Sequence, residues 1–234
     1  MTGIAHNLQH TRERIAAACA AAGRSTDNVT LLAVSKTFGA EAVREAHAAG
    51  QRAFGENYVQ EALDKIAALA DLRADLEWHL IGPLQSNKTR VVAESFDWVH
   101  SVDRLRIAER LSAQRPEGLP PLQVCLQVNV SGEASKSGVP PAEVAALAAQ
   151  VAQLPRLRLR GLMSIPEPAA DFDTQRAPHR VLRALLEGLR QQGLALDTLS
   201  MGMSADLEAA VAEGATIVRI GTAIFGGRTY PVHP

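Results

Sequence analysis

The sequence predicts an α/β protein that folds as a single (β/α)8 TIM barrel with an extra N-terminal helix. Short apolar runs alternate with Ala-rich helical runs, and eight such apolar runs follow the first helix. No long low-complexity linker separates them, and a length of 234 residues suits one barrel. We therefore expect one domain over residues 1–234.

The eight apolar runs are the predicted strands. Several are continuously apolar and too short to be helices, which is typical of parallel strands that are covered on both faces. In chain order they are Thr30–Val34, Arg52–Gly55, Glu77–Ile81, Trp98–Ser101, Gln123–Asn129, Leu159–Ser164, Thr198–Met201 and Ile217–Ile220.

Helical runs fill the intervals. The first, from about Ile4 to Ala22, precedes the first strand. The others are Glu41–Ala49, Val59–Ala70, Lys88–Glu94, Arg104–Gln114, Ala142–Gln153, Arg176–Gln192 and Asp206–Glu213. A doubly wound open sheet is the alternative, but the glycine-rich dinucleotide fingerprint expected after its first strand is absent: TLLAVSKTFGAE contains one glycine.

Composition excludes several classes of function. The formal charge of −1 argues against nucleic-acid or anionic-membrane binding. The N-terminus lacks the apolar core of a signal peptide and no stretch reaches spanning length, so we expect a cytoplasmic protein. Cys19 and Cys125 lie in apolar surroundings and are expected in the core, not in a disulfide. The histidines show no metal-ligand spacing, so we predict no metal.

Lysine is rare in this chain, which otherwise uses arginine for positive charge. Only Lys36, Lys65, Lys88 and Lys136 occur. A lysine amine can lose its proton and attack a carbonyl, whereas arginine cannot. Lys36 directly follows the first strand, at the rim where barrels build their active sites, and burial there would favour the neutral nucleophile. The alternative is a solvated loop lysine.

The segments SMGMSAD and RIGTAIFGGR follow the seventh and eighth strands, where barrels commonly bind phosphate. Ser204 is expected to cap the helix that follows it. Gly202 and Gly221 would let backbone N–H groups approach an anion, and Thr222 adds a hydroxyl. For either loop alone, the alternative to a phosphate site is a set of ordinary turn glycines and a helix cap.

Two further side chains are candidates within strands. Arg219 should point away from both of its neighbours and, if buried, needs an acceptor. That acceptor could be a carboxylate in the core, or a ligand ring nitrogen or phosphate. His79, beside Trp78, could be a core histidine with satisfied hydrogen bonds or a cofactor contact.

Seven segments together resemble the YggS/PROSC family, the pyridoxal phosphate homeostasis proteins, over nearly the whole chain from Val29 onward. They are LLAVSKTF, FGENYVQEA, WHLIGPLQSNKTR, SVDR, QVNVSGEASKSG, GLMSIP and LSMGMSADLEAAVAEGATIVRIGTAIFGGR. The resemblance implies a fold type III barrel like that of alanine racemase. It also implies that pyridoxal 5'-phosphate (PLP) is held on Lys36 as a Schiff base, the internal aldimine.

The resemblance also implies individual roles around PLP. The phosphate would lie near Ser200, Ser204, Gly221 and Thr222, with Arg219 facing the pyridine nitrogen and Asn57 near the ring. The expected cofactor-binding residues are Lys36, Asn57, His79, Ser200, Met201, Ser204, Arg219, Gly221 and Thr222. No residue is assigned a catalytic role.

The family's role predicts a monomeric, non-catalytic carrier or buffer of PLP that contacts apo PLP-dependent enzymes only transiently. The alternative is an amino-acid racemase or another fold type III PLP enzyme. Racemisation needs acid–base groups on both faces of the bound amino acid. In racemases of this fold the second group is a tyrosine from a partner's β domain, and the rim tyrosine available here is Tyr58. A Schiff-base aldolase without cofactor is a third, weaker reading.

Overall fold

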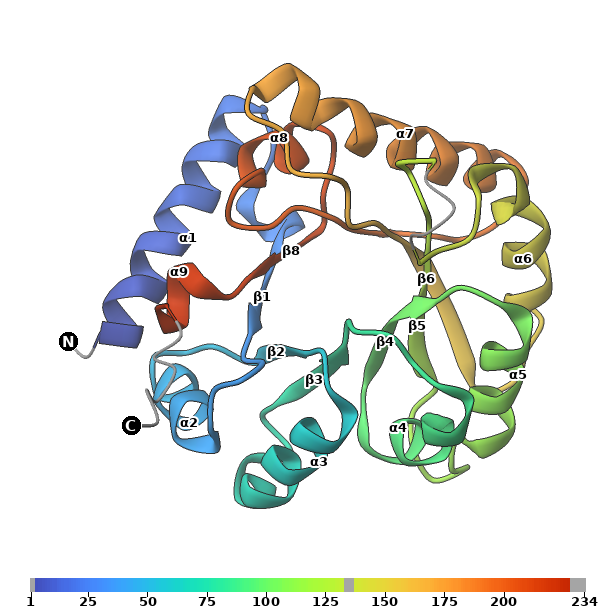
Figure 1. The fold of residues 1–234 in the computed structure, drawn as a ribbon, viewed down its shortest axis with the longest axis horizontal. Coiled ribbons are helices and arrows are strands. Elements are labelled where there is room, and N and C mark those ends of the chain that lie inside the picture. Colours follow the sequence, from blue (N-terminus) through green and yellow to red (C-terminus); the bar gives the residue numbers. More distant parts are fainter. Residues whose placement is uncertain (1–2, 133–136, 228–234) are drawn as a thin grey trace, which may run out of the picture.

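The computed structural model describes residues 3–132 and 137–227. In this part of the chain eight parallel strands pair in chain order, and β8 pairs with β1 to close a barrel (Figure 1). The predicted barrel is therefore confirmed. The strands are β1 Thr30–Val34, β2 Ala53–Glu56, β3 Glu77–Leu80, β4 Trp98–Val102, β5 Leu122–Gln127, β6 Leu157–Met163, β7 Thr198–Ser200 and β8 Ile217–Ile220.

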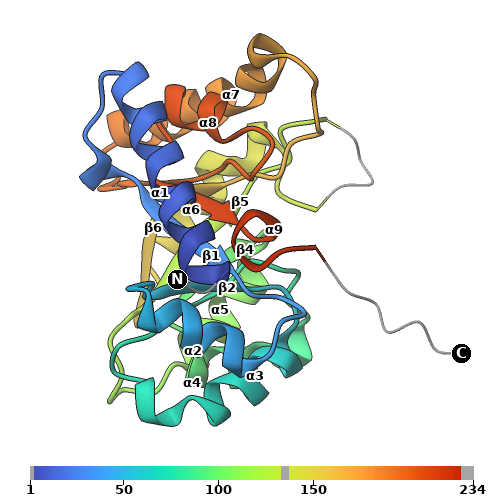
Figure 2. The same ribbon diagram turned by 90° about the vertical axis from the view of Figure 1, so that its left-hand side faces the viewer.

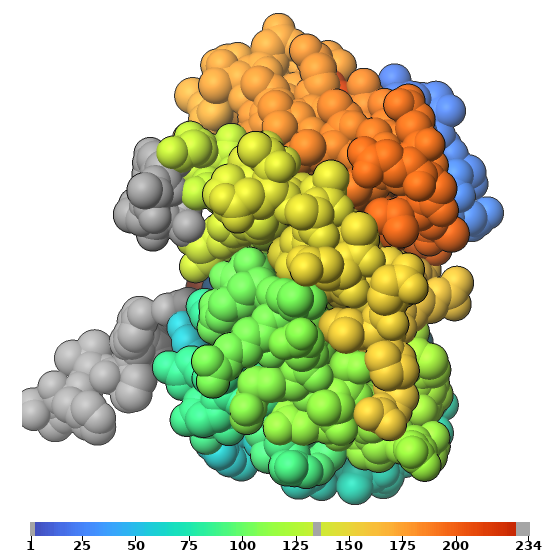
Figure 3. Space-filling view, turned by 90° about the vertical axis from the view of Figure 1, so that its right-hand side faces the viewer, coloured from blue at the N-terminus to red at the C-terminus, as the bar shows by residue number. Residues whose placement is uncertain are grey.

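A helix follows each strand and covers the outside of the barrel. Figure 3 shows α5, α6 and α7 as one continuous layer, coloured from green to orange. None of the helices in the described part of the chain is long and apolar enough to cross a bilayer. The helices between the strands are α2 Ala40–Ala48, α3 Val59–Ala68, α4 Thr89–Ser95, α5 Leu105–Gln114, α6 Val144–Val151, α7 Phe172–Gln191 and α8 Leu207–Ala212.

The N-terminal helix α1, Gly3–Ala21, completes the outer ring of helices. The helix after β8 is the single turn α9, Thr222–Phe225, which is too short to cover the outer faces of β8 and β1. Instead α1 packs against α8, α9 and α2 (Figures 1 and 2). Arg14 of α1 makes a bidentate ion pair with Glu208 of α8, at 2.6 and 2.7 Å.

The alternation of side chains along the strands divides the interior into two cores. The larger core lies between strands and helices and contains Phe54, Trp78 and Leu126. The smaller core fills the barrel itself with Leu32, Val34, Ala53, Ile81, Trp98, Cys125, Met163 and Ile217. Both cysteines are buried and free, as expected, and burial raises the pKa of the Cys125 thiol to about 12.

One helix begins earlier than the sequence predicts. The pattern placed the start at Arg176, but α7 begins at Phe172. The Asp171 carboxylate accepts a hydrogen bond from the Thr174 N–H, at 2.9 Å, and so caps the first turn. The polar composition of this first turn obscured the helix, because its apolar periodicity begins only further along.

Candidate functional site

Lys36 lies at the carboxyl end of β1, two residues beyond the last strand residue Val34. The alternation that turns Leu32 and Val34 into the barrel carries Lys36 to the inner side of the mouth. Its side chain is half-buried, and its amine makes no hydrogen bond or ion pair with any described residue. Lys136 lies outside the described residues. The amine of Lys36 is therefore available to a ligand.

A buried ion-pair cluster lies directly behind Lys36; we call it the Lys65 cluster, formed by Ser35, Glu56, Glu61 and Lys65. The Lys65 amine lies 2.7 Å from the carbonyl oxygen of Ser35 and from one carboxylate oxygen each of Glu56 and Glu61. The Ser35 hydroxyl donates to Glu56 at 2.5 Å. Burial raises the pKa of Glu56, and the nearby Lys65 charge opposes that shift.

The Lys65 cluster holds the backbone on both sides of Lys36. The preceding carbonyl, of Ser35, accepts from Lys65, and the following N–H, of Thr37, donates to Glu61 at 2.5 Å. Thr37 has a φ of 69°, a left-handed conformation that is uncommon for a β-branched residue. A turn with this strain persists because its surroundings hold it, so the position of Lys36 is well determined.

The Lys65 cluster was not predicted from the sequence. One signal was present: Lys65 is one of four lysines, and it follows Glu61 by one helical turn on α3. Its second partner, Glu56, ends β2 and points out of the barrel toward α3. That partnership depends on how α3 packs on β2, which spacing along the chain does not reveal.

Asn57 and Ser164 present buried polar atoms at the same end of the barrel. Asn57 follows β2, and Ser164 follows β6. Asn57 Oδ1 and Ser164 Oγ are buried and have no hydrogen-bond partner among the described residues. Gly82 packs so closely on Asn57 that a Cβ atom there would lie 2.1 Å from the Asn57 carbonyl oxygen. Buried polar atoms without partners indicate a place where a ligand supplies them.

The loop after β7 differs from the prediction. Ser204 does not cap a helix, because α8 begins only at Leu207. The Asp206 carboxylate accepts from the Met203 N–H, at 2.7 Å, and from His179 Nε2, at 2.8 Å, and so folds the segment into a turn. The Ser204 hydroxyl makes no hydrogen bond with the described residues and is therefore free for a ligand.

Glycines bring the two loops close to the neighbouring backbone. Gly202 has a φ of 95°, and a Cβ there would lie 2.5 Å from the Ala210 side chain. Gly221 lies against β1, where a Cβ would be 3.2 Å from the Val34 carbonyl oxygen. Thr222 follows at the exposed start of α9. Larger residues at 202 and 221 would displace the loops that carry Ser204 and Thr222.

Arg219 points into the barrel and is buried, as predicted, with 4% of its surface exposed. Its guanidinium donates to the Ser200 hydroxyl and to the Ser164 carbonyl oxygen, each at 2.8 Å. In the described residues no carboxylate forms an ion pair with it, so the alternative of a core ion pair does not hold. Burial lowers the pKa of Arg219 to about 10, which leaves it protonated near neutral pH.

Two predicted residues lie away from the rim. His79 is inside the barrel, bonded to Glu77 at 2.7 Å and to His100 at 2.9 Å, which is the arrangement of a core histidine with satisfied hydrogen bonds. Met201 packs its side chain into the outer core between strands and helices. Neither position therefore favours contact of the side chain with a ligand at the rim.

The remaining candidates gather on one side of the mouth. Lys36 and Asn57 follow β1 and β2, whereas Ser204 and Thr222 follow β7 and β8. The closed barrel makes these four strands consecutive neighbours, in the order β7, β8, β1, β2. An amine, a guanidinium, free hydroxyls and buried polar atoms without partners therefore share one rim. These groups fit the aldehyde, ring and phosphate of the cofactor that the sequence resemblance implies.

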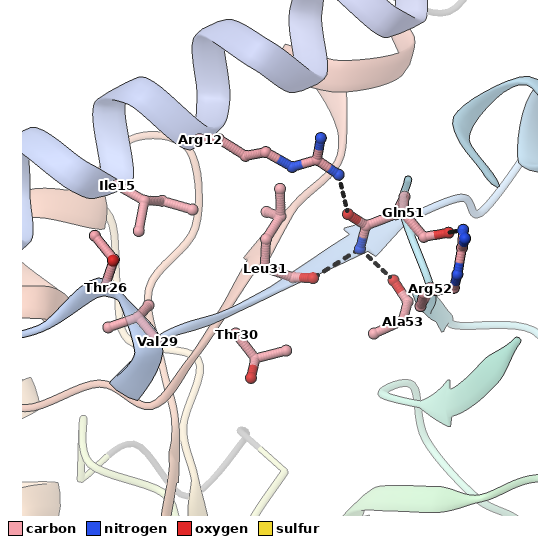
Figure 4. Close-up of a pocket in the computed structure, with 9 residues that line it drawn as sticks. All are labelled: Arg12, Ile15, Thr26, Val29, Thr30, Leu31, Gln51, Arg52 and Ala53. Atoms are coloured by element: carbon pink, nitrogen blue, oxygen red, sulfur yellow. Dashed lines mark hydrogen bonds between the residues drawn. The ribbon is translucent and has the colours of Figure 1, made fainter. Parts of the chain in front are cut away.

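A separate cavity lies at the opposite end of the strands (Figure 4). It is bounded by α1 and the first residues of β1 and β2, and Gln51 crosses it by donating to the carbonyl oxygens of Leu31 and Ala53 at 2.8 Å. None of the predicted site residues lines this cavity. It belongs to the packing of α1 on the barrel, and not to the candidate site.

The chain as a whole is similar to known proteins of one family. The model of the family described as "Alanine racemase, N-terminal domain" matches residues 4–229. The pyridoxal phosphate homeostasis protein of Pseudomonas aeruginosa is 66% identical over 230 residues, which cover 98% of each chain. The protein of the same name from Escherichia coli K12 is 58% identical over 231 residues, covering 98% of this chain and 99% of that one.

Solved structures show the same barrel. PipY of Synechococcus elongatus, in a structure with PLP bound, is 44% identical and superposes with a TM-score of 0.83, covering 95% of this chain and 100% of that chain. Alanine racemase from Corynebacterium glutamicum is 20% identical with a TM-score of 0.67, and the match covers 99% of this chain but 63% of the racemase. This second likeness concerns the fold alone.

Proposed function

Since the chain belongs to the family of the alanine racemase N-terminal domain, we propose that it binds PLP on Lys36 and serves PLP homeostasis as a carrier or buffer. The relatives named for PLP homeostasis and PipY with its bound PLP support this proposal. The observation that carries it is the half-buried amine of Lys36, which has no partner among the described residues although the backbone on both sides is held by the Lys65 cluster.

Each group at the rim has a part in holding the cofactor. When bound, PLP supplies an aldehyde for covalent attachment and a phosphate for anchoring. Lys36 would hold the aldehyde carbon through its amine, and the Ser204 and Thr222 hydroxyls with the Gly221 backbone would hold the phosphate. Arg219 would donate to the ring nitrogen. A guanidinium that stays protonated keeps that nitrogen unprotonated, and the ring is then a weak acceptor of electrons.

Borohydride reduction tests the attachment. Treating the purified, cofactor-loaded protein with borohydride should fix the cofactor on the peptide that contains Lys36, as read by peptide mass spectrometry. Lys36→Ala should abolish the visible absorption band of the attached cofactor, and Lys88→Ala should leave it intact. An adduct on Lys65, Lys88 or Lys136 in the native protein would contradict the assignment.

A carrier without turnover is favoured over a racemase. Lys36 can exchange a proton on one face of a bound amino acid, and racemisation needs a second group opposite it. Among the described residues Tyr58 is the tyrosine at the rim, but it is 54% exposed and its hydroxyl makes no hydrogen bond with them. The weak electron acceptance that Arg219 imposes also disfavours loss of the α-proton.

Incubation with single amino-acid enantiomers in deuterium oxide distinguishes the two functions. Chiral chromatography and mass spectrometry should show at most slow deuterium incorporation without inversion. Many inversions per protein molecule, abolished by Tyr58→Phe, would establish a racemase with Tyr58 as the second group.

The proposal extends to a cytoplasmic monomer that hands PLP to apo-enzymes through brief contacts. Large apolar side chains stand exposed on three loops at the mouth: Tyr58 at 54%, Ile165 at 45% and Met203 at 36%. Three exposed apolar side chains around the cofactor site suit a weak, transient contact with another protein. Sedimentation should give a single-chain mass, and loaded protein should activate an apo PLP-dependent enzyme faster than its rate of PLP release into buffer allows. Activation no faster than that release would reject direct transfer.

A further inference from the structure

A line of hydrogen bonds crosses the inside of the barrel from Arg219 to Glu77; we call it the axial relay. Arg219 Nη1 lies 2.8 Å from Ser200 Oγ, which lies 2.8 Å from His100 Nδ1. His100 Nε2 lies 2.9 Å from His79 Nδ1, and His79 Nε2 lies 2.7 Å from Glu77 Oε1. The five residues come from β3, β4, β7 and β8, so the relay spans the barrel between opposite walls.

With both histidines neutral, the carboxylate end of the relay sets the direction of the bonds between its members. A guanidinium only donates and a carboxylate only accepts. Ser200 Oγ accepts from Arg219 and donates its own proton to His100 Nδ1. His100 is then protonated at Nε2 and donates to His79, which is protonated at Nε2 and donates to Glu77. Both histidines are neutral Nε2–H tautomers in this arrangement, and all four bonds point the same way.

The surroundings keep the relay in this state. His100, His79 and Ser200 are at most 1% exposed. Burial lowers the pKa of His100 well below its usual range, which preserves the unprotonated Nδ1 that Ser200 needs as an acceptor. His79 stacks on Trp98, with ring centroids 5.2 Å apart and planes within 9°, so its ring plane is fixed.

The relay ends at the base of the barrel, where its last member meets solvent. The Glu77 side chain is 49% exposed and lines a cavity there with Trp98 and Arg160. Its hydrogen bond from His79 lowers the pKa of Glu77, so the carboxylate is ionised at neutral pH. The positive end of the relay thus lies near the mouth and the negative end at the base.

We propose that Glu77, His79 and His100 are positioning residues for Arg219, and that they orient its guanidinium toward the ring nitrogen of PLP. Polarisation along three neutral groups brings the influence of a carboxylate to Arg219. A carboxylate in direct contact would instead occupy the N–H groups that the ring nitrogen needs. The inference rests on the proposed function, because it assumes that Arg219 meets the cofactor ring.

The direction of the relay is testable without cofactor. Nitrogen-15 NMR of histidine-labelled protein free of PLP should show His79 and His100 as neutral Nε2–H tautomers at pH 8, with the signals assigned by loss in His79→Phe and His100→Phe. An Nδ1–H tautomer or a charged ring at His100 would reverse or break the relay and overturn the inference. This result does not depend on whether Lys36 binds PLP.

Cofactor affinity tests the positioning role. His100→Phe and Glu77→Leu should each raise the Kd for PLP about 3- to 10-fold, the equivalent of one net hydrogen bond, and shift the visible band of the bound cofactor. Glu77→Gln should have a smaller effect than Glu77→Leu, because its amide oxygen still accepts from His79 although the carboxylate charge is lost. If Glu77→Leu acted only through a general loss of packing, Glu77→Gln would not restore affinity through this hydrogen bond.

Thr198→Val is the matched control. Thr198 lies on β7 two residues before Ser200, and its hydroxyl bonds to Asp197 and not to the relay. The Kd and the visible band should be unchanged in this variant. If His100→Phe does not fold, the two Glu77 variants at the half-exposed end of the relay decide the question. Native affinity and spectrum in Glu77→Leu would overturn the inference, whereas failure of the native protein to attach PLP would overturn the proposed function instead.

Discussion

The molecule buries positive charge in two places and neutralises it in two different ways. In the Lys65 cluster, opposite charges touch: the amine lies 2.7 Å from both Glu56 and Glu61. In the axial relay, the opposite charges of Arg219 and Glu77 stand at the two ends, with Ser200, His100 and His79 between them.

The difference matches what each charge has to do. The Lys65 amine has all three of its protons engaged by protein oxygens, so it can fix a backbone but cannot serve a ligand. Arg219 bonds only to neutral groups and keeps donors for a ligand. Direct pairing suits a residue that supports the site, and pairing through neutral groups suits one that takes part in it.

Breaking the ion pair between Lys65 and Glu56 should have the largest effect, a loss of protein stability. Lys65→Met leaves the fully buried Glu56 without its charge partner, and the free energy of unfolding should fall by about 3–5 kcal/mol in chemical denaturation. The double variant Lys65→Met with Glu56→Leu should recover much of the loss, since no charge remains buried. Lys88→Met, outside the cluster, should change stability by less than about 0.5 kcal/mol. A Lys65→Met protein as stable as the native one would show that the pair contributes little.

Substitutions in the loops after β7 and β8 should act independently of the Lys65 cluster and of the axial relay. Ser204→Ala and Thr222→Ala should each weaken PLP binding by about 1–3 kcal/mol, the usual loss of a hydrogen bond to a charged acceptor, when measured by equilibrium dialysis. Unfolding should be nearly unaffected, because neither hydroxyl bonds to the described residues. Pyridoxal, which lacks the phosphate, should bind far less well and should not distinguish the variants. Equal affinity for the two compounds would exclude a phosphate site in these loops.

The smallest effect should come from titrating the negative end of the relay. The His79 hydrogen bond lowers the pKa of Glu77 below its ordinary value of 4.5, so the unfolded chain takes up this proton at higher pH than the folded protein does. The stability that Glu77 adds is complete above about pH 4.5 and is lost as the pH falls through the lower folded value. Glu77→Gln should therefore flatten the acid side of the curve of unfolding free energy against pH. A steeper acid limb in the variant would contradict this sign.

Local patterns along the chain were sufficient for the framework. β1 and β8 have the predicted bounds, because each short, mostly apolar run ends at a small residue, Ser35 after β1 and Gly221 after β8. The rarity of lysine singled out Lys36, and strand alternation indicated the inward Arg219. The predicted cap at Ser204 failed because Asp206 competes for the same turn through Met203 and His179, and the second of these contacts comes from α7.

The sequence by itself determined the eight-stranded barrel, the position of Lys36 at its mouth and the two loops beside it, because these follow from periodicity and from turn residues close together in the chain. Only the tertiary structure decided what those residues touch. His100 and Ser200 are separated by 100 positions and lie on strands that are not neighbours, so their bond exists only because the barrel closes. Lys65 meets Glu56 only because α3 packs back on β2. Side-chain partners across a closed sheet depend on curvature and register, which no single segment encodes.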